Sequence, residues 1–190
     1  KKKTIPPLAQ LAREGYAIVT PIPSCTLMFK QELPLMFPDD ADVQAVRAAM
    51  FDPFEYLMLR HKDGLLKTDF KRDLGKVSYH IPCHLRVQNM GQKTREVLQL
   101  ATQQKLNTIE RCSGHSGSWG CKKEFHAMAM KIGRPVFRAA GEHPAGDQAD
   151  WIASDCQLAG RHIEQGLRES GKSAAQLAHP LTLLRTAYGL

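Results

Sequence analysis

The order of apolar and polar positions along the chain divides it into short strands and amphipathic helices. Apolar residues at helical spacing, bounded by Pro, Asp or Gly, predict helices over 5–14, 26–32, from the turn at 38–43 to 50, from 51 to 60, 85–105, 121–131, 157–169 and from 179 onward. Runs rich in β-branched and apolar residues predict strands over 16–20, 76–81, 107–110 and 151–154, with 16–20 expected to be buried. Loops are expected over 62–75 and 139–149. Because strand, loop and helix alternate, we expect an α/β fold.

Two parts of the chain resemble each other at a nearly constant offset. The predicted strand, loop and helix around Cys25 match those around Cys156, 131 positions later, and Pro53 matches Pro180, 127 positions later. Similar segments at one offset are typical of a duplicated unit. We therefore expect tandem pseudo-repeated units, of which the first is incomplete.

The repeat also predicts where the two units meet. Residues 1–75 are expected to be the C-terminal part of the first unit, and residues 76–190 are expected to form a complete second unit. Residues 62–75, at the end of the first range, are rich in charged side chains and are typical of a surface connection.

Composition and charge indicate which broad class of protein this chain belongs to. The chain has 190 residues, of which 43% are hydrophobic and 24% charged, as in ordinary globular domains. The net charge is +7, but the basic residues are scattered and only 7% of residues are aromatic, so we expect no nucleic-acid partner. No apolar run reaches the roughly 20 residues of a membrane span. We expect a cytoplasmic protein, with the inner face of the cytoplasmic membrane as an alternative place.

The cysteines carry the candidate chemistry. The chain has five of them, an odd number spread along its length, which argues against a secreted disulfide scaffold. Cys83, Cys112 and Cys156 each follow a predicted strand, and the carboxyl ends of strands are where open α/β sheets bind ligands. Thiolates prefer iron–sulfur clusters, zinc or Cu(I). These three cysteines are therefore candidate metal ligands.

The segments around these cysteines resemble a known family. Tyr79-His-Ile-Pro-Cys-His84, Cys112-Ser-Gly-His-Ser-Gly117 and Ser154-Asp-Cys156 are similar to the CCG cysteine-rich domain. That domain occurs in heterodisulfide reductase, in the iron–sulfur subunit of glycolate oxidase and in anaerobic glycerol-3-phosphate dehydrogenase. The similarity extends to Lys122-Lys-Glu124 and to the closing His179-Pro-Leu-Thr-Leu-Leu184, so that it covers nearly the whole chain.

The resemblance implies an oxidoreductase subunit that transports electrons. It implies an iron–sulfur cluster, of the 4Fe-4S type, held by Cys83, Cys112 and Cys156, with electrons passing between a flavoprotein dehydrogenase and a quinone or another carrier. The family pattern has further cysteines where this chain has Ser113 and Ala159. The chain is thus expected to transfer electrons within a complex and not to act as a stand-alone catalyst.

The thinned cysteine set leaves a fourth ligand to be found. His115, in the glycine-rich loop after Cys112, is our first candidate, because backbone freedom is large there. His84, Cys121 and His162 are the alternatives. Two of these residues have an ordinary structural interpretation as well: a locally hydrogen-bonded loop histidine for His115, and a small, partly buried residue for Cys121.

The glycine-rich loop itself is the last candidate element. Gly114 and Gly117 are expected to let backbone N–H groups approach the cluster's sulfur atoms, where hydrogen bonds tune the redox potential. The spacing of these glycines does not match that of a phosphate-binding loop.

Two other functions compete with electron transfer. The first is a docking module that has kept the fold but lost the cluster, as the missing thiols suggest. The second is a zinc site in which Cys83, Cys112, Cys156 and His115 supply a Cys3His ligand set, which suits zinc.

Overall fold

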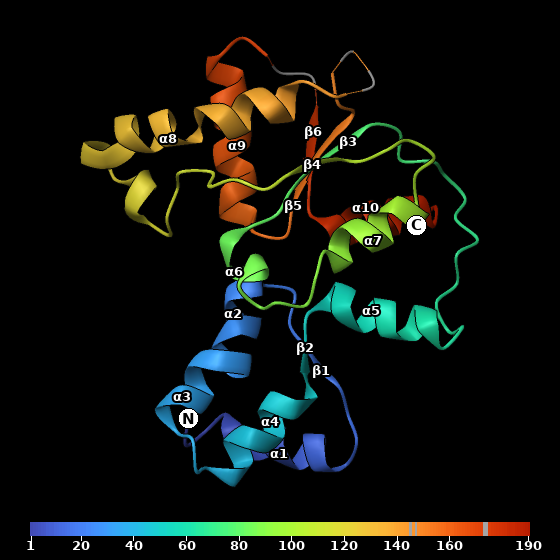
Figure 1. The fold of residues 1–190 in the computed structure, drawn as a ribbon, viewed down its shortest axis with the longest axis vertical. Coiled ribbons are helices and arrows are strands. Elements are labelled where there is room, and N and C mark those ends of the chain that lie inside the picture. The colour runs from blue at the N-terminus through green and yellow to red at the C-terminus, as the bar shows by residue number, and fades with distance from the viewer. Residues whose placement is uncertain (145, 147, 173–174) are drawn as a thin grey trace.

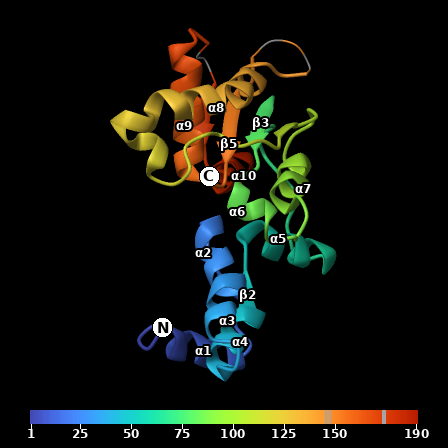
Figure 2. The same cartoon turned by 60° about the vertical axis from the view of Figure 1, so that its left-hand side comes forward.

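The computed structural model of the protein describes residues 1–144, 146, 148–172 and 175–190, and has two parallel sheets with helices packed around them (Figure 1). Residues 1–51 lie at one end of an elongated molecule, and the described residues from 53 onward lie toward the other end (Figure 2). The strands are β1 (Ile18–Val19), β2 (Met50–Phe51), β3 (Val77–His80), β4 (Asn107–Ile109), β5 (Trp151–Ser154) and β6 (Gln176–Ala178). The helices are α1 (Ile5–Arg13), α2 (Pro23–Leu27), η1 (Met28–Glu32), α3 (Leu33–Met36), α4 (Ala41–Ala49), α5 (Pro53–Lys62), α6 (Cys83–Arg86), α7 (Lys93–Leu100), η2 (Trp119–Cys121), α8 (Lys123–Gly141), α9 (Gln157–Glu169) and α10 (Pro180–Ala187).

The larger sheet has four parallel strands in the order β4-β3-β5-β6. Tyr79 is in register with Thr108 on one side and with Ala153 on the other. Successive side chains of a strand point to opposite faces, so Ala153 packs toward α7 and α10 while Ile152 packs toward α8 and α9. The sheet is therefore covered by helices on both faces, which confirms the predicted α/β class.

The smaller sheet belongs to the first part of the chain. β1 pairs in parallel with β2, and α1 packs on α4 over a separate core that includes Ile5, Val46 and Met50. Phe54 of α5 is buried against Val97 of α7 and Leu184 of α10. This apolar contact joins the first part of the chain to the larger sheet.

Apart from the helix that follows the glycine-rich loop, three of the predicted elements differ from the structure. The predicted buried strand over 16–20 is wrong in length and burial, since β1 has two residues and Val19 is 41% exposed. The predicted helix over 85–105 is interrupted between α6 and α7, where Asn89 and Gly91 have φ of 55° and 78°. The predicted helix over 26–32 is part of a longer helical segment that begins at α2 and ends with α3.

The helix that follows the glycine-rich loop is longer than predicted. α8 continues to Gly141, beyond Pro135, because Val136 and Phe137 pack on the sheet and on α9 and so outweigh the local cost of the proline. The loop predicted over 139–149 therefore starts later, and positions 145 and 147 lie outside the described residues. The predictions for β5 and α9 are confirmed residue by residue.

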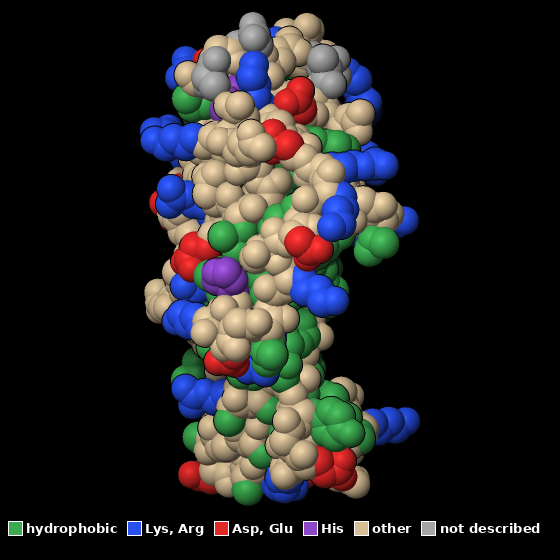
Figure 3. Space-filling view, turned by 90° about the vertical axis from the view of Figure 1, so that its right-hand side faces the viewer, with side chains coloured by type: hydrophobic (Ala, Val, Ile, Leu, Met, Phe, Trp, Pro, Cys, Tyr) green, Lys and Arg blue, Asp and Glu red, His purple; other side chains and the backbone are tan. Residues whose placement is uncertain are grey.

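Charged side chains are mixed over the surface. On the face drawn in Figure 3, Lys and Arg lie apart from one another, with Asp and Glu between them. Among the described residues, no helix is both long enough and apolar enough to cross a membrane.

Candidate functional site at the carboxyl ends of the strands

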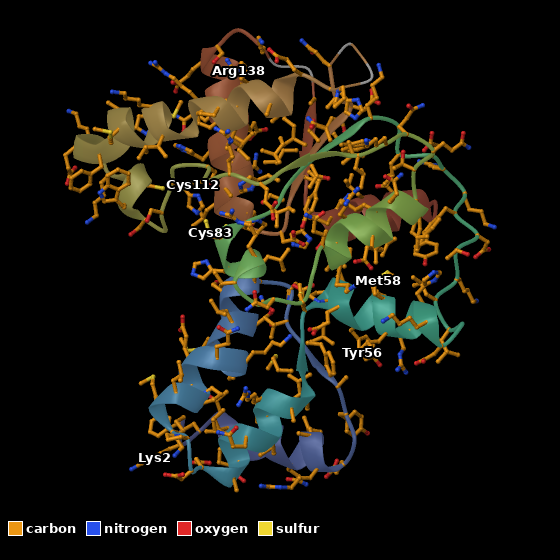
Figure 4. The ribbon with its side chains drawn as sticks, in the orientation of Figure 1. Lys2, Tyr56, Met58, Cys83, Cys112 and Arg138 are labelled. Carbon is orange, nitrogen blue, oxygen red and sulfur yellow. The ribbon has the colours of Figure 1, made fainter. Side chains whose placement is uncertain are left out.

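Three cysteines lie in the segments that leave three neighbouring strands. Because β4, β3 and β5 are parallel and adjacent, their carboxyl ends share one edge of the sheet. Cys83 begins α6 just after β3, Cys112 lies in the loop after β4, and Cys156 is the N-cap residue of α9 just after β5. Figure 4 labels Cys83 and Cys112, which lie at the same end of the sheet. All three have free thiols; Cys83 and Cys112 are exposed and Cys156 is half-buried.

Cys156 and His115 form a close pair of candidate ligands. The Sγ atom of Cys156 lies 3.8 Å from Nε2 of His115. The other ring nitrogen, Nδ1, is 2.8 Å from the Oγ atom of Ser113. Burial lowers the pKa of His115, and the neighbouring His162 and His84 lower it further, so its imidazole is held in the neutral form in which it can bind a metal.

The other two sulfur atoms each accept a hydrogen bond. The backbone N–H of Gly114 donates to Sγ of Cys112 at 3.4 Å, and a guanidinium N–H of Arg86 donates to Sγ of Cys83 at 3.6 Å. Gly114 has a φ of 91°, and a Cβ atom there would collide with the carbonyl oxygen of Ala129. The position thus requires glycine for two independent reasons. These donors suit a negatively charged group held by thiolates.

Gly117 lies in a more open part of the same loop. It also has a positive φ, of 59°, but nothing lies within 4 Å of the place where a Cβ atom would be. Its requirement for glycine is therefore conformational, in contrast to the crowded surroundings of Gly114.

The alternative fourth ligands, His162, His84 and Cys121, differ in burial. His162 is 7% exposed, its ring centre lies 6.5 Å from that of His115, and its Nε2 atom has no hydrogen-bond partner among the described residues. His84 is exposed. Cys121 is also exposed and closes η2, two residues before α8 begins. Of the three, His162 lies in a buried position beside the first candidate.

The donor types fit a soft metal, but the distances do not complete a single-ion site. Within the described part of the chain, no group of three or more His, Cys, Asp or Glu side chains is arranged to hold one metal ion. A cluster binds its ligands through several iron atoms, so its donors need not converge on one point. The structure thus contains soft donors along one sheet edge, of which Cys156 and His115 form a close pair.

A buried histidine connects two of the cysteine loops. His80, the last residue of β3, is 2% exposed. Its Nε2 atom lies 2.9 Å from the carbonyl oxygen of Arg111, and its Nδ1 atom lies 3.1 Å from Oγ of Ser154. The backbone N–H of Cys156 donates to the same Oγ at 3.3 Å. Burial lowers the pKa of His80 to about 4, so the ring is neutral at physiological pH.

A buried carboxyl forms a second polar network on the opposite face of β3. Tyr79 donates its hydroxyl to Asp155 at 2.6 Å, and Thr94 of α7 donates to the other carboxyl oxygen at 3.0 Å. Burial raises the pKa of Asp155 to about 7, and the nearby charge of Asp52 adds to the effect. Thus both residues that precede Cys156 are hydrogen-bonded inside the protein.

The sequence pattern did not single out these two networks. The segments that resemble the family include Tyr79, His80, Ser154 and Asp155. The pattern indicated a role for the neighbouring cysteines and none for these four residues. A signal was present, since these polar residues occupy strand ends that are otherwise apolar. A buried polar side chain at such a position requires a partner.

Comparison with known proteins agrees with a redox assignment at a coarse level. The chain is 27% identical over 176 residues to the C subunit of anaerobic glycerol-3-phosphate dehydrogenase from Escherichia coli (strain K12), and equally to that from Escherichia coli O157:H7. The chain resembles a dehydrogenase subunit. The match covers 92% of this chain and 41% of those relatives, so the chain spans about two-fifths of their length. No family model matches the chain.

Proposed function

We propose that this chain is an electron-transfer subunit or domain of a redox complex, passing electrons between a flavin-dependent dehydrogenase and a quinone or another carrier. The observation that carries the proposal is the placement of Cys83, Cys112 and Cys156 after three adjacent parallel strands. The similarity to a dehydrogenase subunit supports the same class of function. The partners we propose are the flavoprotein and the other subunits of such a complex.

The proposed cofactor is an iron–sulfur cluster of the 4Fe-4S type. Cys83, Cys112 and Cys156 would hold it, with His115 as the fourth ligand. Such a cluster, when bound, accepts and donates single electrons. The chain's own contribution is to supply soft donors, and to direct N–H donors from Gly114 and Arg86 at the sulfur atoms.

We also propose that the chain contains two tandem units of the CCG type, divided near residue 75. The order β5-α9-β6-α10 in the larger sheet has a counterpart in β1, the helical segments from α2 to α4, β2 and α5 of the first part of the chain. In both, the two strands are parallel and the final helix begins at a proline, Pro180 in α10 and Pro53 in α5. In this scheme Cys25 belongs to the first unit.

Anaerobic purification tests the proposed function directly. We expect a brown protein that contains iron and acid-labile sulfide in nearly equal amounts. Cys112→Ser should lose most of the colour and iron, whereas Cys121→Ser, which removes another exposed thiol, should retain both. Unchanged iron in Cys112→Ser would refute the ligand assignment.

A cluster-free docking module is the second candidate, and one observation favours it. Two positions where the family pattern has thiols carry residues that are used otherwise: Ala159 is fully buried in α9, and Ser113 is bonded to His115. A colourless, metal-free protein that still binds a flavoprotein would support this function. A colourless protein with stoichiometric zinc would instead support the Cys3His zinc site.

A further inference from the structure

The side chain of His80 connects segments that are far apart in the sequence. The carbonyl group of Arg111 can only accept a hydrogen bond, so the hydrogen of the neutral ring must be on Nε2 of His80. The Nδ1 atom is then an acceptor, and it receives the hydroxyl hydrogen of Ser154. The hydroxyl oxygen in turn accepts the N–H of Cys156. A continuous chain of hydrogen bonds thus runs from the residue before Cys112 to Cys156.

This chain of bonds begins where the backbone ladder of the sheet ends. The last backbone hydrogen bond in this region between the β3 and β4 segments joins the N–H of Ile81 to the carbonyl of Ile109 at 3.0 Å. The contact between His80 and Arg111 lies beyond it, toward Cys112. It extends the pairing of the two segments by two residues, through a side chain.

Burial makes these contacts strong and directional. His80 and Ser154 are 2% and 3% exposed, so water does not compete for their polar atoms. Breaking one bond leaves a buried group unsatisfied, which costs more than the bond itself contributes. Removing Ser154 should therefore disturb the ring of His80 and, through it, the loop at Arg111.

We propose that His80 and Ser154 are positioning residues, which hold the loops of Cys112 and Cys156 in fixed places relative to β3 and Cys83. The inference rests on the proposed function, because it concerns the same thiols. It assigns these two residues no contact with a bound group.

Hydrogen exchange of the metal-free protein, followed by mass spectrometry, tests the proposal. In Ser154→Ala we expect exchange of the amides in 110–116 and 155–158 to rise about tenfold, as for the loss of one buried hydrogen bond. The rise in 110–116 is the decisive part, since the hydroxyl of Ser154 bonds to His80 and Cys156 and is linked to Arg111 through the His80 ring. His80→Leu, which keeps the size of the side chain, should raise exchange in both segments, and Ser154→Thr, which keeps the hydroxyl, should restore the slow rates.

Ser78→Ala is the matched control. Ser78 lies two residues before His80 in β3 and is also a fully buried strand serine. Its hydroxyl oxygen accepts a hydrogen bond from the side-chain amide of Asn107 at 3.0 Å and takes no part in the His80 network. This substitution should leave amide exchange in 110–116 and in 155–158 unchanged. Unaltered exchange in 110–116 for Ser154→Ala and His80→Leu would overturn the proposal, and so would a uniform rise over the whole chain, which would indicate general destabilisation only.

Reconstitution with Fe²⁺ and sulfide, under anaerobic conditions, separates this inference from the proposed function. We expect the iron–sulfur absorption to appear at about tenfold higher Fe²⁺ in Ser154→Ala than in Ser78→Ala. If the wild-type protein incorporates no iron and sulfide, the proposed cluster is refuted, and the exchange experiment still decides the role of His80 and Ser154.

Discussion

The buried imidazole of His80 should make part of the protein's stability depend on pH. Burial lowers its pKa from 6.5 to about 4 in the folded protein. Between these values the unfolded chain binds a proton that the folded protein does not, so stability rises with pH through this window. The two pKa values differ by about 2.5 units. Because one pKa unit corresponds to about 1.36 kcal/mol, the difference amounts to about 3 kcal/mol of unfolding free energy. This contribution is fully present above pH 6.5 and is lost as the pH falls toward 4.

The assay is urea unfolding of the wild type and of His80→Leu at several pH values between 4.5 and 7.5. The difference between the two free energies of unfolding isolates His80, because Asp52 and Asp155, whose raised pKa values act in the opposite direction in this window, remain in both proteins. We expect the advantage of the wild type to shrink by about 2–3 kcal/mol at the acidic end. In Ser154→Ala, which breaks the same network without removing a titrating group, the loss should be nearly constant with pH. A constant difference for His80→Leu would refute the reasoning.

Three further substitutions test the packing and the polar contacts by urea unfolding at neutral pH. Gly166→Ala should cost about 1–3 kcal/mol, because the new methyl group would collide with the ring of Phe137, and combining it with Phe137→Ala should be less than additive. Tyr79→Phe should cost about 1–3 kcal/mol, since it leaves a carboxyl oxygen of buried Asp155 without its donor. Asp52→Ala should cost about 1 kcal/mol by removing the N-cap of α5, whereas Asp52→Asn, which keeps an acceptor, should cost less.

The sequence pattern predicted those elements whose local signal and packing agree. The segment over 157–169 has an apolar stripe at helical spacing, and the structure has α9 over those same residues. The pattern was misleading where tertiary packing decided the outcome. α8 continues beyond Pro135 because its apolar face is covered, and β2 and β6, with two and three residues, are too short to give a periodic signal.

The site could be predicted from the sequence only as far as the sheet determines it. Cysteines placed directly after strands indicated a common edge, and the parallel order of β4, β3 and β5 provides one. Distances within that edge depend on loop conformation, which a residue pattern does not specify. The closeness of Cys156 and His115, and the contact of Ser113 with the same imidazole, therefore required the structure.

The position of Cys156 depends on the register of the sheet. Tyr79 and His80 are adjacent in β3 and point to opposite faces. His80 bonds to Ser154, the last residue of β5, and Tyr79 bonds to Asp155, which follows it. Their partners, Asp155 and Ser154, directly precede Cys156. Hydrogen bonds on both faces of the sheet, from the neighbouring residues Tyr79 and His80, thus hold the backbone that leads to this thiol. Because a slip of one residue would exchange the two faces, the apolar packing that fixes the register also fixes the candidate ligand.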